Sequence, residues 1–155
     1  MAGLRGVFFD TSVLVAGMVE LGPDSEAPFR LLDAVASGRI APARTAWHCC
    51  LEFFSVTTRL PEEYRLDPDT ALRFVQGELL GRFEVDALPA RNRRSFLISA
   101  VDQGVSGGRI YDAHIAEVAR RAGSEIVVTE NRRHFTGLLR HGVRVLLSSE
   151  LVAEL

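Results

Sequence analysis

The chain has 155 residues, of which 47% are hydrophobic and 25% are charged, and its formal net charge is −2. This length and composition predict one globular domain over residues 1–155. The near-neutral balance excludes a nucleic-acid-binding class that is recognised by strong positive charge alone. All 18 basic residues are nevertheless arginines, either because the genome is rich in G and C or because guanidinium groups bind phosphate well.

The two cysteines and the first apolar run bear on the compartment. Cys49 and Cys50 are adjacent, a spacing that rarely forms a structural disulfide, and two such residues do not make a zinc site. This pattern favours a reducing, cytoplasmic environment. The apolar run at 6–17 is interrupted by Asp10 and is too short to cross a bilayer, so we expect no membrane association.

Short β-branched or aromatic runs alternate along the chain with longer segments of helical periodicity. In chain order we expect a strand at 6–9, helices at 11–18 and 25–37, a strand at 39–43, helices at 45–60 and 68–82, a strand at 82–88, helices at 90–103 and 111–122, and strands at 125–129 and 143–147. This alternation predicts an α/β fold in which a parallel sheet is covered by helices on both faces.

Several element boundaries have chemical signals. Thr45 and Ser149 are placed to cap the starts of two helices, and Gly123 is placed to end the helix at 111–122. The helix at 25–37 is expected to bury one apolar face: Phe29, Leu32, Val35 and Ala36.

Three acidic residues stand out by their position. Asp10 directly follows the first strand, at the sheet edge where ligands bind in parallel α/β folds. Asp112 lies near the start of a helix, and Glu52 lies within the helix at 45–60. Either of the first two acids is also explained as a helix cap or a first-turn acid stabilised by the helix dipole.

The helix at 45–60 is apolar around most of its circumference, so we expect it to be mostly buried. Its polar residues fall in one stripe: Thr45, His48, Glu52, Ser55 and Arg59. That stripe faces either solvent, with Glu52 paired to His48 or Arg59, or a cleft.

If the three acids converge on one crevice, their charges repel one another unless a cation is bound. Carboxylate oxygens without His or Cys ligands select Mg²⁺ or Mn²⁺. A carboxylate-held Mg²⁺ with open positions suits the hydrolysis of phosphodiester bonds, because it activates water and neutralises the charge on the phosphate.

Four stretches, "FFDTSVLV", "LEFFSVTTR", "RIYDAHIAEVA" and "VVTENRRHF", resemble the motif blocks of PIN-domain ribonucleases, in particular the VapC-type toxins of bacterial toxin–antitoxin pairs. The likeness runs from about residue 6 to residue 147, with the blocks in the family's order. It implies a PIN-like three-layer sandwich with a five-stranded parallel sheet flanked by helices. It also implies Mg²⁺- or Mn²⁺-dependent cleavage of RNA, a homodimer, and inhibition by a small VapB-like antitoxin.

By this resemblance, Asp10, Glu52 and Asp112 match the metal-binding acids of the family. Thr129 matches a hydroxyl that orients the first acid, and Ser12 matches a small polar residue of the first block.

The chain departs from the pattern twice. Asn131 stands where many members of the family carry a fourth acid, so three carboxylates remain to hold one metal ion and the binding of a second ion stays open. Glu130 could take the place of that acid, but neighbouring residues of an extended segment point in opposite directions, so we favour Asn131 for this position. His134 replaces another acid and is expected to do nothing.

RNA-binding residues are expected near the crevice, namely Arg132, Arg133 and Arg59. Unstacked bases are commonly held by aromatic rings, and Tyr111 is a candidate because it adjoins Asp112.

Two other functions fit parts of the sequence. Asn131 leaves open a catalytically weak PIN-like module that binds RNA or a partner without cutting. A phosphatase of the haloacid-dehalogenase type also begins with strand–Asp, but it needs a second Asp where Ser12 stands and a Lys that this chain lacks.

Overall fold

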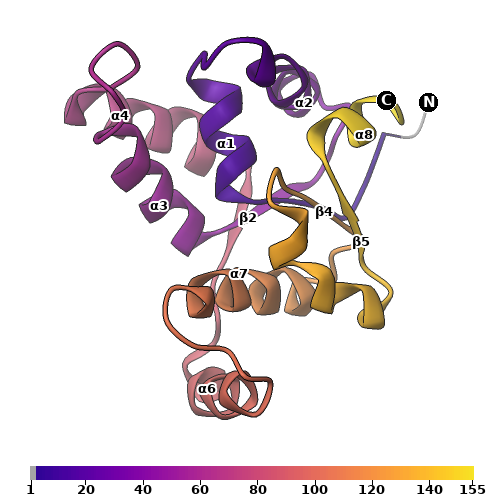
Figure 1. Cartoon of the computed structure of the whole chain (residues 1–155). Helices are drawn as coiled ribbons and strands as arrows, with labels where there is room; N and C mark the ends of the chain where they lie inside the picture. Colours follow the sequence, from indigo (N-terminus) through magenta and orange to yellow (C-terminus); the bar gives the residue numbers. More distant parts are fainter. Residues whose placement is uncertain (1–2) are drawn as a thin grey trace.

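The computed structural model describes residues 3–155, and a five-stranded, all-parallel sheet lies at its centre (Figure 1). The strands are β1 (Val7–Phe9), β2 (Ala43–Ala46), β3 (Glu84–Asp86), β4 (Ile126–Val128) and β5 (Arg144–Leu146). Their order in the sheet is β3-β2-β1-β4-β5, and every neighbouring pair is parallel. Strands β2 and β3 are therefore added on one side of β1, and β4 and β5 are added on its other side.

Helices cover both faces of this sheet (Figure 1). The helices are α1 (Thr11–Met18), α2 (Glu26–Ala36), α3 (Trp47–Thr57), α4 (Pro68–Phe74), α5 (Leu80–Arg82), α6 (Arg93–Asp102), α7 (Arg109–Arg121) and α8 (Ser148–Val152), and the turns Val75–Leu79 join α4 to α5. In Figure 1, α1, α2 and α8 lie above the sheet and α7 lies below it, with α6 beneath α7. The expected α/β layers and five parallel strands are confirmed.

The core sits around the two central strands. Every residue of β1 and β4 is buried, with Val7, Phe8 and Phe9 wholly inaccessible to solvent. A strand that is covered on both faces needs a continuous apolar run rather than an alternating pattern. This explains why the sequence at 7–9 and 126–128 is apolar without interruption and why the first polar residue after each strand lies at the sheet edge.

The boundary between β2 and α3 differs from the expectation. Thr45 belongs to β2, and its hydroxyl donates to the Phe9 carbonyl oxygen at 2.8 Å instead of capping the helix. Ala46 occupies the cap position. Ser149 is likewise inside α8, which begins after Leu147, whereas Gly123 follows α7 with φ of 74° as expected.

Two helices present faces that differ from the expected ones. In α2 the buried residues are Pro28, Leu31, Ala34 and Val35, whereas Phe29 is 65% exposed. Val35 is buried as expected and Leu32 packs against the core, whereas Phe29 and Ala36 face solvent, because α2 carries more apolar residues than one face holds. Helix α3 is not mostly buried, because an apolar stripe spaced at helical intervals faces solvent: Trp47, Leu51 and Phe54.

Candidate active site

The switch in strand order places the ends of β1 and β4 side by side, at the carboxyl edge of the sheet where parallel α/β folds bind ligands. Asp10 follows β1 and its backbone N–H donates to the Val128 carbonyl oxygen at 3.1 Å. Its side chain is 4% exposed and makes no capping hydrogen bond to α1. Helix capping therefore does not account for the Asp10 carboxylate.

Two hydroxyl groups hold the Asp10 carboxylate. Ser12 Oγ and Thr129 Oγ1 each donate to Asp10 Oδ2 at 2.8 Å. The same hydroxyls accept the backbone N–H groups of the loop after β4, from Glu130 to Ser12 and from Asn131 to Thr129, both at 3.0 Å. Ser12 and Thr129 thus tie the start of α1 to the end of β4 and fix the direction of the Asp10 side chain.

Burial raises the pKa of Asp10 above its ordinary value, and the charge of Asp112 adds to that effect. Hydrogen bonds from Thr129 and Ser12 act in the opposite direction. A carboxylate that is buried beside another acid and lacks a cationic partner among residues 3–155 is costly to ionise. Such a group is suited to holding a cation.

Glu52 lies on α3, next to the start of α1. Its Oε1 accepts a hydrogen bond from Thr11 Oγ1 at 3.1 Å and lies 3.4 Å from His48 Nε2, one helical turn earlier. Burial raises the pKa of Glu52, and the charges of Asp10 and Asp112 raise it further, whereas Thr11 and His48 lower it. Both arrangements expected for the polar stripe of α3 are therefore present in part. Glu52 pairs with His48, and it is also close enough to Asp10 and Asp112 for their charges to affect its pKa.

Asp112 lies in the first turn of α7, and its Oδ2 is 2.8 Å from His134 Nδ1. His134, for which the sequence suggested no role, therefore contacts one of the proposed metal-binding acids. The short 3₁₀ segment Arg132–His134 turns this side chain back toward α7.

The three carboxylates gather without forming a preformed metal cage. Within residues 3–155, no group of three His, Cys, Asp or Glu side chains is arranged closely enough to hold a metal ion. Glu52 is engaged by Thr11 and His48, and Asp112 is engaged by His134. The donor chemistry, three mutually repelling carboxylates, still fits Mg²⁺ or Mn²⁺.

The turn after β4 separates the remaining candidates. Asn131 precedes the segment Arg132–His134, and its exposed side chain makes no capping hydrogen bond. The Glu130 carboxylate instead accepts the Ser148 N–H at 3.2 Å, at the start of α8. Of these two neighbours, Glu130 is therefore held by a backbone N–H group and Asn131 caps no helix.

The expected RNA-binding arginines lie in different surroundings. Arg132 forms an ion pair with Glu150, and Arg59 is exposed after the end of α3. Arg133 lines a groove that also reaches Asp112. The neighbouring residues Arg132 and Arg133 therefore have unlike contacts, which sequence adjacency did not indicate.

A cluster of aromatic rings lies beside the acids. The sequence indicated only one member of this cluster, Tyr111. The rings of His48 and Tyr111 are stacked with centroids 5.4 Å apart, and His114 packs edge-on against His48 at 5.3 Å. Phe96 of α6 lies 5.7 Å from His114. The signal for His114 was its i, i+3 spacing from Tyr111, which places both rings on one face of α7.

Acids and hydroxyls gathered at the switch point of a β3-β2-β1-β4-β5 parallel sheet define an α/β protein with a polar site at the sheet's carboxyl edge. The model of the PIN domain family matches residues 6–133 of this chain. The chain therefore belongs to the PIN domain family.

Known relatives agree with this assignment. The chain is 29% identical over 123 residues to "Ribonuclease VapC40" of Mycobacterium tuberculosis, a match that covers 79% of this chain and 85% of the relative.

Solved structures of similar fold include VapBC-1 from nontypeable Haemophilus influenzae, with a TM-score of 0.61, 13% identity and coverage of 94% of this chain and 99% of that one. FitAcB from Neisseria gonorrhoeae has a TM-score of 0.60 and 16% identity, and the match covers 92% of this chain and 98% of that one. PAE2754 from Pyrobaculum aerophilum has a TM-score of 0.59 and 22% identity over 99% and 97% of the two chains. At these identities the likeness concerns the fold.

Proposed function

We propose that the chain is a Mg²⁺- or Mn²⁺-dependent endoribonuclease and the toxin of a toxin–antitoxin pair. The observation that carries the proposal is Asp10, a buried carboxylate at the switch point that two hydroxyls aim and that the charge of Asp112 repels. The name of the relative, Ribonuclease VapC40, supports RNA as the substrate class.

Asp10, Glu52 and Asp112 would hold the cation, and Asn131 offers a neutral amide oxygen at the same sheet edge. A bound Mg²⁺ supplies an oriented water of lowered pKa and neutralises charge on the scissile phosphate. Ser12 and Thr129 keep Asp10 aimed into the crevice. His134 fixes the rotamer of Asp112 through its 2.8 Å contact.

Replacing the acids by their amides tests the assignment. Asp10→Asn and Asp112→Asn keep the side-chain shape but remove the charge that attracts the cation, so we expect RNA cleavage in Mn²⁺ to fall at least about a thousandfold. The measurement is the shortening of a labelled single-stranded RNA by each purified variant, with folding checked by circular dichroism.

Glu62→Gln is the matched control, since it removes one charge from an exposed residue outside the crevice. It should cleave at the parental rate. Parental cleavage by a folded Asp10→Asn or Asp112→Asn variant would show that these acids are not the catalytic residues.

Asn131 keeps a second function in view, an RNA- or partner-binding module that does not cut. The same assay separates the two, because a binding module protects RNA without shortening it at any Mn²⁺ concentration. If the chain is such a binding module because Asn131 weakens its metal site, Asn131→Asp should strengthen metal binding by supplying a fourth carboxylate.

The proposal includes a small antitoxin partner, a homodimer and a cytoplasmic location. The exposed apolar stripe Trp47, Leu51 and Phe54 on α3 supports a protein partner, because contiguous apolar surface marks interaction sites. Sedimentation of the purified chain tests the dimer, and a monomer at every concentration would contradict it.

Cys49 and Cys50 are buried free thiols, which agrees with a reducing compartment. No helix within residues 3–155 is long and apolar enough to cross a membrane.

A further inference from the structure

A groove of about 660 Å³ runs between α6, α7 and the 3₁₀ segment η5 (Thr136–His141), and it begins at Asp112. Helix α7 forms its floor, where the small side chains of Ala113 and Ala116 leave room between the walls. Helix α6 forms one wall and η5 forms the other. Because Asp112 belongs to the proposed catalytic site, the groove is continuous with that site.

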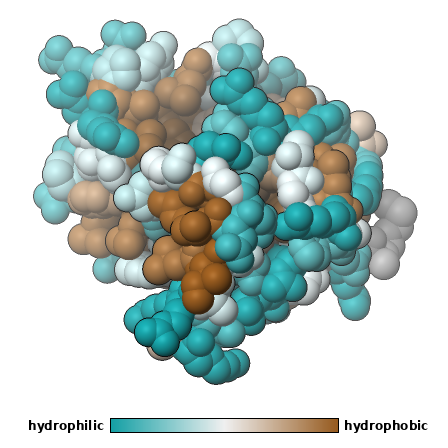
Figure 2. Space-filling model, turned by 60° about the horizontal axis from the view of Figure 1, so that its bottom comes forward, coloured by the Kyte–Doolittle hydropathy of each residue, from teal (hydrophilic) through white to brown (hydrophobic). Residues whose placement is uncertain are grey.

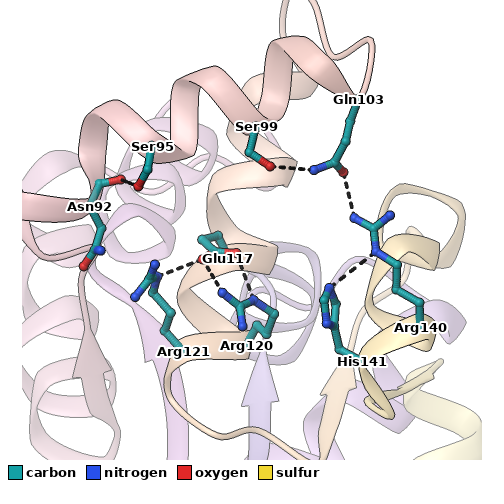
Figure 3. A network of polar contacts seen from close by, with 9 residues as sticks. All are labelled: Asn92, Ser95, Ser99, Gln103, Glu117, Arg120, Arg121, Arg140 and His141. Atoms are coloured by element: carbon teal, nitrogen blue, oxygen red, sulfur yellow. Dashed lines mark hydrogen bonds and ion pairs between the residues drawn. The ribbon is translucent and has the colours of Figure 1, made fainter.

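Arginines dominate the charge of this groove. Five arginines and two histidines line it against two acids, Asp112 and Glu117. Glu117 already binds Arg120 at 2.7 Å and Arg121 at 2.8 Å, as Figure 3 shows. These two arginines therefore share one carboxylate, which offsets one of their two positive charges.

The other three arginines keep their charge available. Arg109 and Arg133 have no ion pair within residues 3–155. Arg140 reaches across the groove from η5 to the neutral amide of Gln103 at the end of α6, at 2.9 Å (Figure 3). Each guanidinium is thus either unpaired or held by an uncharged group, which leaves three positive charges along one groove.

The dimensions and chemistry of the groove suit a nucleic acid strand. Asp112 and Arg120 are eight residues apart on α7, which corresponds to about 12 Å along the helix axis. That span accommodates roughly three to four stacked nucleotides at ~3.4 Å each. Guanidinium groups bind phosphate through two parallel hydrogen bonds, so the three arginines of this groove suit the phosphate groups of a nucleic acid.

An acidic peptide would satisfy the same arginines, but the groove is also lined by Asp112, one of the three proposed cation-binding acids. A peptide carboxylate and a phosphodiester are both anions that Asp112 repels, but only the phosphodiester is the group on which a cation held there would act. When the bottom of the Figure 1 view, where α6 lies, is turned forward, the surface shows a hydrophobic patch bordered by hydrophilic residues (Figure 2).

We infer that this groove binds the sugar–phosphate backbone of single-stranded RNA as it leaves the scissile bond, with Arg109, Arg133 and Arg140 as its phosphate-binding residues. The inference rests on the proposed function, because the RNA must reach Asp112.

Salt-dependent RNA binding tests this inference. A labelled oligouridylate is titrated with the full chain in EDTA, which prevents cleavage, and fluorescence anisotropy gives the affinity at several salt concentrations. Replacing all three arginines by Gln should weaken binding at least about tenfold and reduce the slope of log affinity against log salt by about 2, at about 0.7 per phosphate contact. Single variants, Arg133→Gln first, should each lose about a third of that slope.

Arg82→Gln is the matched control, since it removes one positive charge from an arginine paired with Glu78 outside the groove. It should leave affinity and slope unchanged. The inference is overturned if the folded triple variant binds RNA like Arg82→Gln. It is also overturned if a labelled oligoglutamate binds more tightly than the RNA and displaces it, which would make the groove a site for an acidic protein segment.

Cleavage assays in Mn²⁺ keep the two proposals apart. If the parent cuts RNA and the triple variant binds RNA normally, the groove assignment alone fails. If the parent never shortens RNA but the triple variant loses binding, the nuclease assignment fails and the groove assignment stands.

Discussion

Asp10 shows how one side chain couples the proposed metal site to the stability of the fold. Burial and the charge of Asp112 raise its pKa, so the folded state binds the Asp10 proton more tightly than the unfolded chain does. The folded state therefore loses stability as the pH rises from the ordinary Asp range through the raised pKa, and the penalty is complete only above that raised pKa.

Asp10→Asn removes this penalty while its amide oxygen still accepts hydrogen bonds from Ser12 and Thr129. We expect the metal-free variant to have a higher free energy of unfolding than the parent at neutral pH, with the difference shrinking as the pH falls through the acidic range. Urea denaturation in EDTA across that range measures it. A variant that is less stable than the parent at neutral pH would show that the Asp10 charge is not a burden on the metal-free fold.

At the scale of single residues, the sequence indicated the groups that follow strand ends and missed those set by turns. Asp10 and Thr129 could be placed because each follows an uninterrupted apolar strand. The contacts of His134, Arg132 and Arg133 depend on the conformation of one 3₁₀ segment, which no periodicity encodes.

Helix α1 carries the start of the site, and its position depends on close packing with α2. A Cβ at Gly17 would lie 2.6 Å from Leu32 Cδ1 and 3.0 Å from the Pro28 carbonyl oxygen. The flexible end of Leu32 can move, but the Pro28 backbone cannot move without shifting α2. Glycine at this position therefore allows α1 to hold Thr11 against Glu52.

Gly17→Ala should lower the free energy of unfolding by about 1–3 kcal/mol, because the overpacking outweighs the better helix propensity of alanine. Gly77→Ala is the matched control: Gly77 lies in the helical turns between α4 and α5, and a Cβ there meets nothing within 4 Å. That control should gain up to about 1 kcal/mol. Equal changes in both variants, measured by urea denaturation, would contradict the packing account.

The sequence predicted the bounds of the helices and strands more accurately than it predicted which side of each helix is buried. Helix α1 matches its expected bounds, and 68–82 forms one continuous helical run through α4 and α5. Thr45 was misplaced because a β-branched hydroxyl residue suits both a strand and a cap, and only its bond to Phe9 decides. Helices α2 and α3 carry more apolar residues than one face needs, so their buried stripes depend on tertiary packing.

At the scale of the whole molecule, the site is assembled from four distant segments by one topological feature. The reversal of strand order between β1 and β4 brings Asp10 beside Thr129, and α3 and α7 add Glu52 and Asp112. Alternating strands and helices were enough to predict that edge. The arginine groove was not predictable, because it depends on how α6 and η5 pack around α7.

Titration of the metal-free chain with Mn²⁺, followed by calorimetry or electron paramagnetic resonance, tests the central claim most directly. The three carboxylates should bind the ion together, so Asp10→Asn and Asp112→Asn should each weaken Mn²⁺ binding at least about tenfold while Glu62→Gln leaves it unchanged. Equal Mn²⁺ affinity in the parent and in both folded amide variants would mean that these acids do not form a common cation site.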